Sequence, residues 1–289
     1  MSWTEAQQKL ARAVYAATLK ASRHAPMDHV VSIGNVFTRT FERSFLTPIY
    51  RAGRVSVHDM NAAALTVRDQ LGEKNRFSGV IPAYGALPAV QNVRGGALYC
   101  AKDLRAQMAE TLHYKSDSAA RPPGSLPIPI AALHTLCMVT IKPVADLNLV
   151  TLAGDGANVD YFYDELQRAP DVRAALAAMK YRDITEAIFS TTEYSAARGF
   201  GLGLVANPGI DGIEVGSARS FETFTSASPM SVFKSGTNVL IFGGNNEVLS
   251  RRLRIVQVTL LDHPRGGADV VTLTPRGNGF FEQASRRRL

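Results

Sequence analysis

Residues 96–110, which read GALYCAKDLRAQMAE, place a strand, a turn and a helix in immediate succession. The apolar residues 97–101 predict a short strand that carries Tyr99, and the polar turn after it leads into a helix predicted over 103–114. Glu110 falls on the second or third turn of that helix. An aromatic ring and a carboxylate brought together at a strand-to-helix junction can form one wall of a catalytic cleft.

Length and composition indicate an ordinary globular protein. The chain has 289 residues, enough for one large domain or two small ones, and 46% of them are hydrophobic. No run of about 18 apolar residues predicts a membrane span. The first 20 residues do not have the pattern of a signal peptide, so we expect a cytoplasmic protein.

The two cysteines, Cys100 and Cys137, fit no metal-ligand spacing and are too few for a disulfide scaffold. Both lie in apolar runs, which predicts buried free thiols in a reducing compartment. No motif predicts a metal site or a prosthetic group.

The formal net charge is +7, and part of the excess comes from Arg286, Arg287 and Arg288, which we expect in a solvated basic tail. A basic surface suits nucleic acid, another polyanionic ligand or an acidic protein. A nucleic-acid-binding protein is therefore a low-ranked alternative, because the chain lacks the interleaved basic and aromatic pattern of such modules.

The first part of the chain is expected to be helical. Residues 3–22 have helical periodicity, with Thr4 and Gln7 resembling a capping box, and a second helical stretch is expected over 30–45. We therefore predict a helical N-terminal extension over 1–46 and a catalytic domain over 47–289.

Short strands and helices alternate through the rest of the chain without a regular βαβ rhythm, which predicts an α+β fold. A loop over a site is expected at 73–96. The other predicted strands are 48–55, 134–142, a short one after 146–149, 211–215, 238–242 and 253–261. The other predicted helices are 60–72, 171–180 and 193–205.

The usual strong catalytic motifs are absent: there is no phosphate-binding P-loop, no GxSxG elbow, no HExxH and no paired CxxC. Gly199, Gly201 and Gly203 lack the spacing of a dinucleotide-binding loop and indicate close helix packing instead. His113 and Glu110 could share a helix face, but one such pair is weak evidence for a metal site, and a structural or solvated histidine is the favoured interpretation.

Several blocks of this sequence nevertheless resemble one family. The stretch IYRAG at 49–53 precedes the Tyr99–Glu110 block. YSAARGFGLGLVANPG, DGIEVGSAR and NVLIF follow, in that order, up to Phe242. Together, over roughly 48–245, they resemble the RES domain family, bacterial toxins named for an arginine, a glutamate and a serine.

The resemblance implies an ADP-ribosyltransferase-like fold and NAD as the substrate rather than as a bound cofactor. It implies that Glu110 and Arg51 are catalytic and that Tyr99, Ser217 and Arg76 bind NAD. The reaction would be cleavage of the nicotinamide–ribose bond by hydrolysis or phosphorolysis, or transfer of ADP-ribose to a protein. Without the resemblance, each of these residues also fits an ordinary structural or surface role.

One segment departs from the family pattern. Where the family has an Arg-Trp-Asn-like motif, this chain reads AVQN at 89–92, so either Arg76 or Arg94 would fill the role of that arginine, or the ligand is held differently. A toxin of this type implies a neutralising antitoxin or immunity protein as partner. It would act in the cytoplasm of its own cell or, if delivered, of a target cell.

Overall fold

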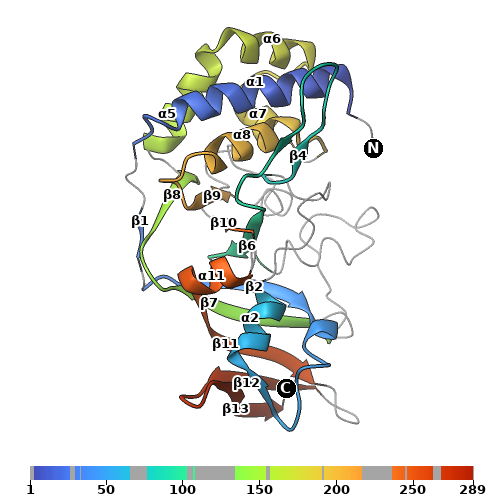
Figure 1. The fold of residues 1–289 in the computed structure, drawn as a ribbon, viewed down its shortest axis with the longest axis vertical. Helices are drawn as coiled ribbons and strands as arrows, with labels where there is room; N and C mark the ends of the chain where they lie inside the picture. The colour runs from blue at the N-terminus through green and yellow to red at the C-terminus, as the bar shows by residue number, and fades with distance from the viewer. Residues whose placement is uncertain are drawn as a thin grey trace.

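The computed structural model describes residues 3–26, 30–32, 34–65, 77–102, 107, 134–153, 157–190, 192–216, 236–244, 246–262 and 268–288. Glu110, Ser217, Arg76 and His113 lie outside these residues. In Figure 1 the helices α1 and α5–α8 gather at one end of the long axis, and the last strands lie at the other.

The helices that the structure describes are α1 (Glu5–Ala21), α2 (Val57–Ala64), α5 (Ala157–Arg168), α6 (Pro170–Ala178), α7 (Ile184–Ile188), α8 (Ser195–Val205), α11 (Asn246–Arg252) and the 3-10 turn η1 (Arg43–Phe45). The described strands are β1 (Val30–Val31), β2 (Phe37–Glu42), β3 (Arg54–Ser56), β4 (Val80–Ile81), β5 (Val90–Gln91), β6 (Ala97–Ala101), β7 (Leu136–Pro143), β8 (Leu147–Leu152), β9 (Gly212–Gly216), β10 (Thr237–Phe242), β11 (Leu253–Asp262), β12 (Asp269–Pro275) and β13 (Phe280–Arg288).

Eleven of these strands form one sheet in the order β1-β8-β9-β10-β6-β2-β7-β11-β12-β13-β3. β8 and β9 are parallel, and the other neighbours in this order are antiparallel. β4 and β5 pair separately as a small hairpin. The mixture of helices and strands confirms the predicted α+β class, while the likeness to an ADP-ribosyltransferase core stays a prediction.

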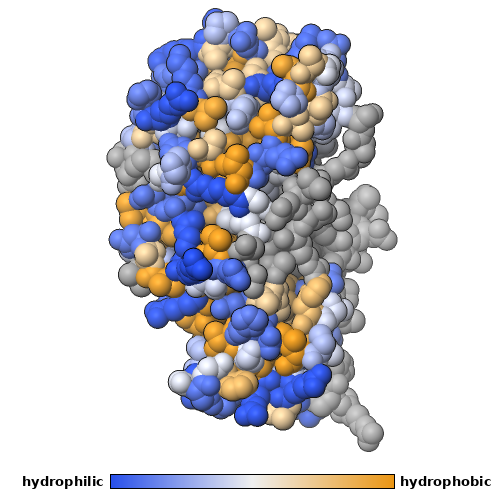
Figure 2. Space-filling view, in the orientation of Figure 1, coloured by the Kyte–Doolittle hydropathy of each residue, from blue (hydrophilic) through white to orange (hydrophobic). Residues whose placement is uncertain are grey.

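Two hydrophobic clusters pack on the sheet, on opposite faces of β6, β8 and β10, and the helices cover one half of its strands. α1, α5, α6, α7 and α8 pack on β8, β9, β10 and β6, which together we call the helix-covered half. The strand-rich half comprises β2, β7, β11, β12, β13 and β3 with α2, and its apolar side chains form most of the second cluster. In the space-filling view, hydrophilic and apolar side chains are interspersed over both halves (Figure 2).

The helix-covered half depends on the glycines of α8. A Cβ at Gly199 would collide with the backbone oxygen of Ala11 in α1, and one at Gly203 would lie 2.6 Å from the Cβ of Thr18. A Cβ at Gly201 would collide with the carbonyl oxygen of Phe77. The predicted close packing of this glycine-rich helix is therefore confirmed, as is α1 with its capping box between Thr4 and Gln7.

The second helix predicted in the N-terminal part, over 30–45, is wrong. Residues 37–42 form β2, which pairs with β6 and β7 in the middle of the sheet. The spacing of the buried Phe37 and Phe41, four residues apart, also fits a helix face, and it is the pairing with β7 and β6 that holds the segment extended. One sheet thus contains residues on both sides of the predicted domain boundary at 46, and the boundary itself stays a prediction.

Two further predictions need correction. The strand expected over 48–55 begins only at Arg54, because Ala52 and Gly53 have φ values of 50° and 76° and form a tight turn. Arg286, Arg287 and Arg288 are exposed, as predicted, but they form the end of β13 rather than a free tail, and Arg286 pairs with Asp269 at 2.6 Å and Asp262 at 3.2 Å. The predicted loop at 73–96 contains the β4–β5 hairpin in its described part.

Candidate active site

A row of paired residues crosses one face of the sheet where five strands begin or end. Leu152 of β8 faces Val215 of β9, Val215 faces Asn238 of β10, Asn238 faces Ala101 of β6, and Ala101 faces Thr38 of β2. Directly paired residues point to the same face of a sheet. We call these five residues the strand-end row.

The strand-end row is where the chain leaves the sheet toward two of the predicted site residues. β6 continues into the segment that contains Glu110, and β9 ends at Gly216, the residue before Ser217. Glu110 and Ser217 lie outside the described residues. The strands that lead to them, β6 and β9, end on either side of Asn238 of β10 in the same row.

Tyr99 lies on the same face as the strand-end row, two residues before Ala101. Its ring is half-buried against the hydrophobic cluster of the helix-covered half. Its hydroxyl accepts a hydrogen bond from the backbone N–H of Phe77 at 3.1 Å. The structure thus brings Tyr99 to the segment that directly follows Arg76 in the sequence.

The helix predicted after β6 has one described residue, Gln107, which is helical and buried. Its side-chain amide donates a hydrogen bond to the hydroxyl of Thr40 at 3.0 Å. Thr40 follows Thr38 by two positions on β2, so it extends the face that carries Tyr99. This hydrogen bond places Gln107, which lies between Tyr99 and Glu110 in the sequence, beside this face.

A buried arginine supports the segment that holds Tyr99. Arg198 of α8 is 5% exposed, donates a hydrogen bond to the carbonyl of Val80 at 3.4 Å, and lies 5.2 Å from the ring centre of Trp3. Gly79, with φ of 127°, packs against this guanidinium. The buried hydroxyl of Ser78 has no hydrogen-bond partner among the described residues.

The opposite face of the same strands carries an ion pair that the sequence analysis missed. The Lys102 ammonium lies 2.5 Å from a carboxylate oxygen of Glu214, whose side chain is only 8% exposed. This pair bridges β6 and β9 across β10. An acidic residue between Ile213 and Val215 in an apolar strand was the signal that could have found it.

Arg51 is not brought to this face. It is exposed at the turn before β3, where its Nε donates to the carbonyl of Pro48 at 3.4 Å. Five strands separate β3 from β6 in the order of the sheet, and no hydrogen bond joins Arg51 to Tyr99.

Arg94, the other candidate for the missing family arginine, has a structural role. Its guanidinium donates to the carbonyl of Ile210 at 2.6 Å and also to the carbonyl of Asn207. Burial, with a smaller contribution from Arg252, lowers the pKa of Arg94. Both carbonyls belong to the loop between α8 and β9. Arg94 therefore joins that loop to the start of β6, and these hydrogen bonds use its guanidinium.

The cysteines are buried free thiols, as predicted. Burial raises the pKa of Cys100 and of Cys137 to about 12 each. Among the described residues, no three His, Cys, Asp or Glu side chains gather closely enough to hold a metal ion. None of the described helices combines the length and the apolar character needed to cross a membrane.

Comparison with known protein families matches residues 48–261, most of the chain, to the RES domain. No curated protein and no solved structure matches the chain. The matched range includes Arg51, Tyr99, Glu110 and Ser217. It begins after β2, so Thr38 and Thr40 of the candidate site lie outside it.

Proposed function

Since this chain belongs to the RES domain family, we propose that it is an NAD-consuming toxin enzyme. It would cleave the bond between nicotinamide and ribose by hydrolysis or phosphorolysis and so deplete the NAD of a cell. The observation that carries this proposal is the strand-end row. On the face of this row lies Tyr99 of β6, and the chain segments with Glu110 and Ser217 follow the ends of β6 and β9, which both pair with β10.

The chemistry suits these residue types. As the bond between the ribose C1′ and the nicotinamide nitrogen breaks, its electron pair leaves with nicotinamide and the ribose becomes oxocarbenium-like. The Glu110 carboxylate stabilises that cation and holds a ribose hydroxyl. Water, or phosphate in the phosphorolytic reaction, then attacks C1′ and loses a proton.

The remaining residues bind the substrate. Tyr99 packs against the ribose or nicotinamide, and Ser217 donates a hydrogen bond to one of them. The Phe77–Tyr99 hydrogen bond supports Arg76 as the cation for the pyrophosphate, because Arg76 is the residue before Phe77. The exposed position of Arg51, five strands away from β6, does not by itself support the catalytic role that the family resemblance implies for it.

The test is release of free nicotinamide from NAD by the purified full chain, with and without inorganic phosphate. Release without phosphate supports hydrolysis, and release that depends on phosphate supports phosphorolysis. A wild-type protein that binds NAD but releases no nicotinamide in either condition would refute the proposal.

A protein acceptor is the alternative, in which ADP-ribose is transferred to a side chain. NAD labelled in the adenosine part distinguishes the two reactions. Label recovered on a cellular protein indicates transfer, and label recovered as ADP-ribose or its phosphate ester indicates NAD degradation. A toxin of either kind would need a neutralising antitoxin or immunity protein and would act in the cytoplasm.

A further inference from the structure

One arginine of α1 holds both arms of the β4–β5 hairpin. A single terminal guanidinium nitrogen of Arg12 donates to the carbonyl of Pro82 and to the carbonyl of Pro88, each at 2.8 Å. Pro82 directly follows β4 and Pro88 lies shortly before β5, so one cation joins the two arms. In Figure 1 the hairpin extends alongside the N-terminal part of α1. Hydrogen bonds from a charged donor are strong and directional, and these two fix the hairpin against the helix.

A second contact to the same region comes from Trp3, just before α1. Its ring packs against the hydrophobic cluster of the helix-covered half and lies 5.2 Å from the guanidinium carbon of Arg198. That guanidinium donates to the carbonyl of Val80 at 3.4 Å, and a Cβ at Gly79 would lie 3.3 Å from its Nε. A cation is attracted to the face of an indole ring, so Trp3 holds Arg198 against the start of the hairpin.

The segment held in this way is the one that contacts Tyr99. Phe77 donates its backbone N–H to the Tyr99 hydroxyl at 3.1 Å. The carbonyl of Phe77 lies so close to Gly201 of α8 that a Cβ there would collide with it. Residues 77–82 are therefore fixed by Tyr99 at one end and by Arg12 at the other.

The packing of α1 on the helices does not require these polar contacts. α1 is already held on α8 at Gly199 and Gly203, where the two helices leave no room for a side chain. Arg12 and Trp3 reach past that interface to the hairpin and to the cation beside it. Both residues also precede residue 48, where the match to the RES domain begins. α1 therefore contributes contacts to the candidate site that the matched range does not contain.

We infer that α1, through Arg12 and Trp3, positions residues 77–82 and with them Tyr99 for substrate binding. Arg12 is a positioning residue, because it acts through the hairpin and not on the substrate. The inference rests on the proposed function, since it takes Tyr99 to contact NAD. It also means that the functional unit begins at α1, before the matched domain.

The first test is the kinetics of NAD cleavage by the full chain with Arg12→Met, which keeps the apolar stem of the side chain and removes its donors. The KM for NAD should rise roughly fivefold because Tyr99 is less well placed, while kcat stays within about twofold of wild type. Arg12→Lys keeps a charged donor and should return the KM to within about twofold of wild type. An unchanged KM in Arg12→Met, or an equal rise in both variants, would overturn the inference.

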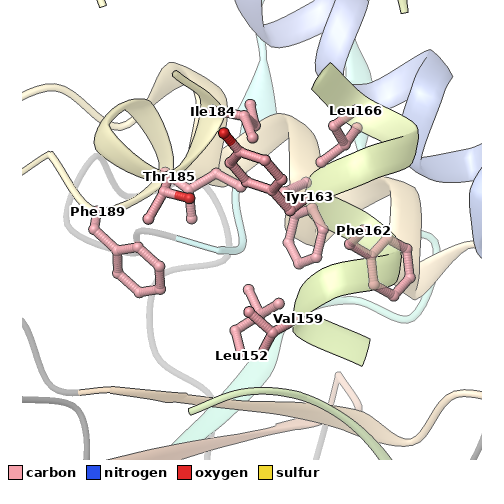
Figure 3. Close-up of a pocket in the computed structure, with 10 residues that line it drawn as sticks. Leu152, Val159, Phe162, Tyr163, Leu166, Ile184, Thr185 and Phe189 are labelled. Atoms are coloured by element: carbon pink, nitrogen blue, oxygen red, sulfur yellow. The ribbon is translucent and has the colours of Figure 1, made fainter. Parts of the chain in front are cut away.

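Ile184→Val is the matched control for a loss of stability alone. Ile184 is 1% exposed and lies among the apolar side chains between α5 and α7 in Figure 3, a cluster that includes no residue of the hairpin. Removing one buried methyl group should lower the melting temperature by roughly 2–4 °C. The KM for NAD should stay unchanged, because partial unfolding lowers the number of active molecules and not their affinity. A KM raised as much as in Arg12→Met would overturn the inference.

Hydrogen exchange at the Phe77 amide tests the positioning without any substrate. This N–H should exchange roughly fivefold faster in Arg12→Met than in wild type or Ile184→Val, because its bond to Tyr99 opens more often. That result would show that α1 positions Tyr99 even if the wild type released no nicotinamide, which would refute only the proposed function. Unchanged exchange in Arg12→Met would overturn the inference whatever the kinetics showed.

Discussion

The helix-covered half and the strand-rich half bury apolar cores of similar composition, but they differ in what else they bury. Nearly all buried polar side chains among the described residues belong to or contact the helix-covered half, including Ser78, Arg198, Glu214 and Asn238. In the strand-rich half Asp269 is the buried charged residue, and it pairs with Arg286 at the surface.

This difference suggests that the helix-covered half contributes mainly to function and the strand-rich half mainly to stability of the fold. Burying polar groups lowers stability unless they are paired, so folds keep them mainly where function needs them. The long antiparallel strands β11, β12 and β13 complete the sheet with apolar pairs and an exposed charged edge. We therefore expect substitutions that touch the face of the strand-end row to change activity, on β2 as well as in the helix-covered half, and substitutions at the far edge of the strand-rich half to leave activity unchanged.

The largest effect is expected at Gly201. Gly201→Ala should lower the free energy of unfolding by about 3 kcal/mol, because the new methyl group would collide with the Phe77 carbonyl. It should also reduce activity, since Phe77 holds the Tyr99 hydroxyl. Urea unfolding and nicotinamide release measure the two effects.

Gly277→Ala is the control in the strand-rich half, because nothing lies within 4 Å of a Cβ built there. Its free energy of unfolding should stay within about 0.5 kcal/mol of wild type. Equal destabilisation by the two substitutions would contradict the close packing described for α8.

Thr40 tests whether β2, outside the matched range, belongs to the site. Thr40→Val keeps the shape of the side chain but removes the hydroxyl that accepts from Gln107, at a cost of about 1 kcal/mol in stability. The rate of nicotinamide release should fall roughly tenfold because the chain leading to Glu110 is displaced.

Thr40→Ser retains the hydroxyl and should restore most of the rate. A Thr40→Val protein with wild-type kcat and KM would show that the hydrogen bond does not position the site. Equal losses in the Val and Ser variants would show that packing, rather than the hydroxyl, is what matters.

Both halves should lose stability at high pH, because each contains one buried cysteine. Cys100 and Cys137 have a pKa near 12 in the fold against an ordinary value of 9.0, so unfolding releases protons above about pH 9. Their contribution to stability is complete below pH 9 and is lost as the pH rises toward 12.

Unfolding in urea at pH 8 and pH 10 measures this loss, which should be smaller in the Cys100→Ala, Cys137→Ala double variant. Both thiols should also resist Ellman's reagent at pH 8 until urea unfolds the chain. Rapid reaction of one thiol in the native protein would show that this cysteine is accessible to solvent and not buried as described.

The smallest effect is expected at the edge of the strand-rich half. Arg286 is 42% exposed, so Arg286→Gln should lower the free energy of unfolding by about 0.5 kcal/mol, less at high salt. Nicotinamide release should be unchanged. A loss of activity comparable with that of Thr40→Val would contradict the expectation that this edge of the sheet takes no part in the reaction.

The sequence predicted those strands and helices whose conformation depends mainly on nearby residues. The apolar runs of β6, β7, β9 and β10 and the helical periods of α1 and α6 lie close to where the sequence placed them. β2 and the end of β13 were missed because their conformation depends on pairing with distant strands. The position of Tyr99 on a strand was predictable, since strand alternation is local.

The partners of the candidate site were not predictable in the same way. The Lys102–Glu214 pair and the Gln107–Thr40 hydrogen bond join residues far apart in sequence, and only the order of the sheet brings them together. Arg94 could be reassigned only once its carbonyl partners were visible. The roles of Glu110, Arg51, Ser217 and Arg76 stay predictions from the family.

The central claim is that Glu110, in the segment that follows Tyr99 in the sequence, drives cleavage of NAD, and the most direct test is nicotinamide release by Glu110→Gln. This variant keeps the size of the side chain and removes its charge. We predict a fall in kcat of about 100-fold or more at an unchanged melting temperature. A folded Glu110→Gln protein that releases nicotinamide at the wild-type rate would contradict the account.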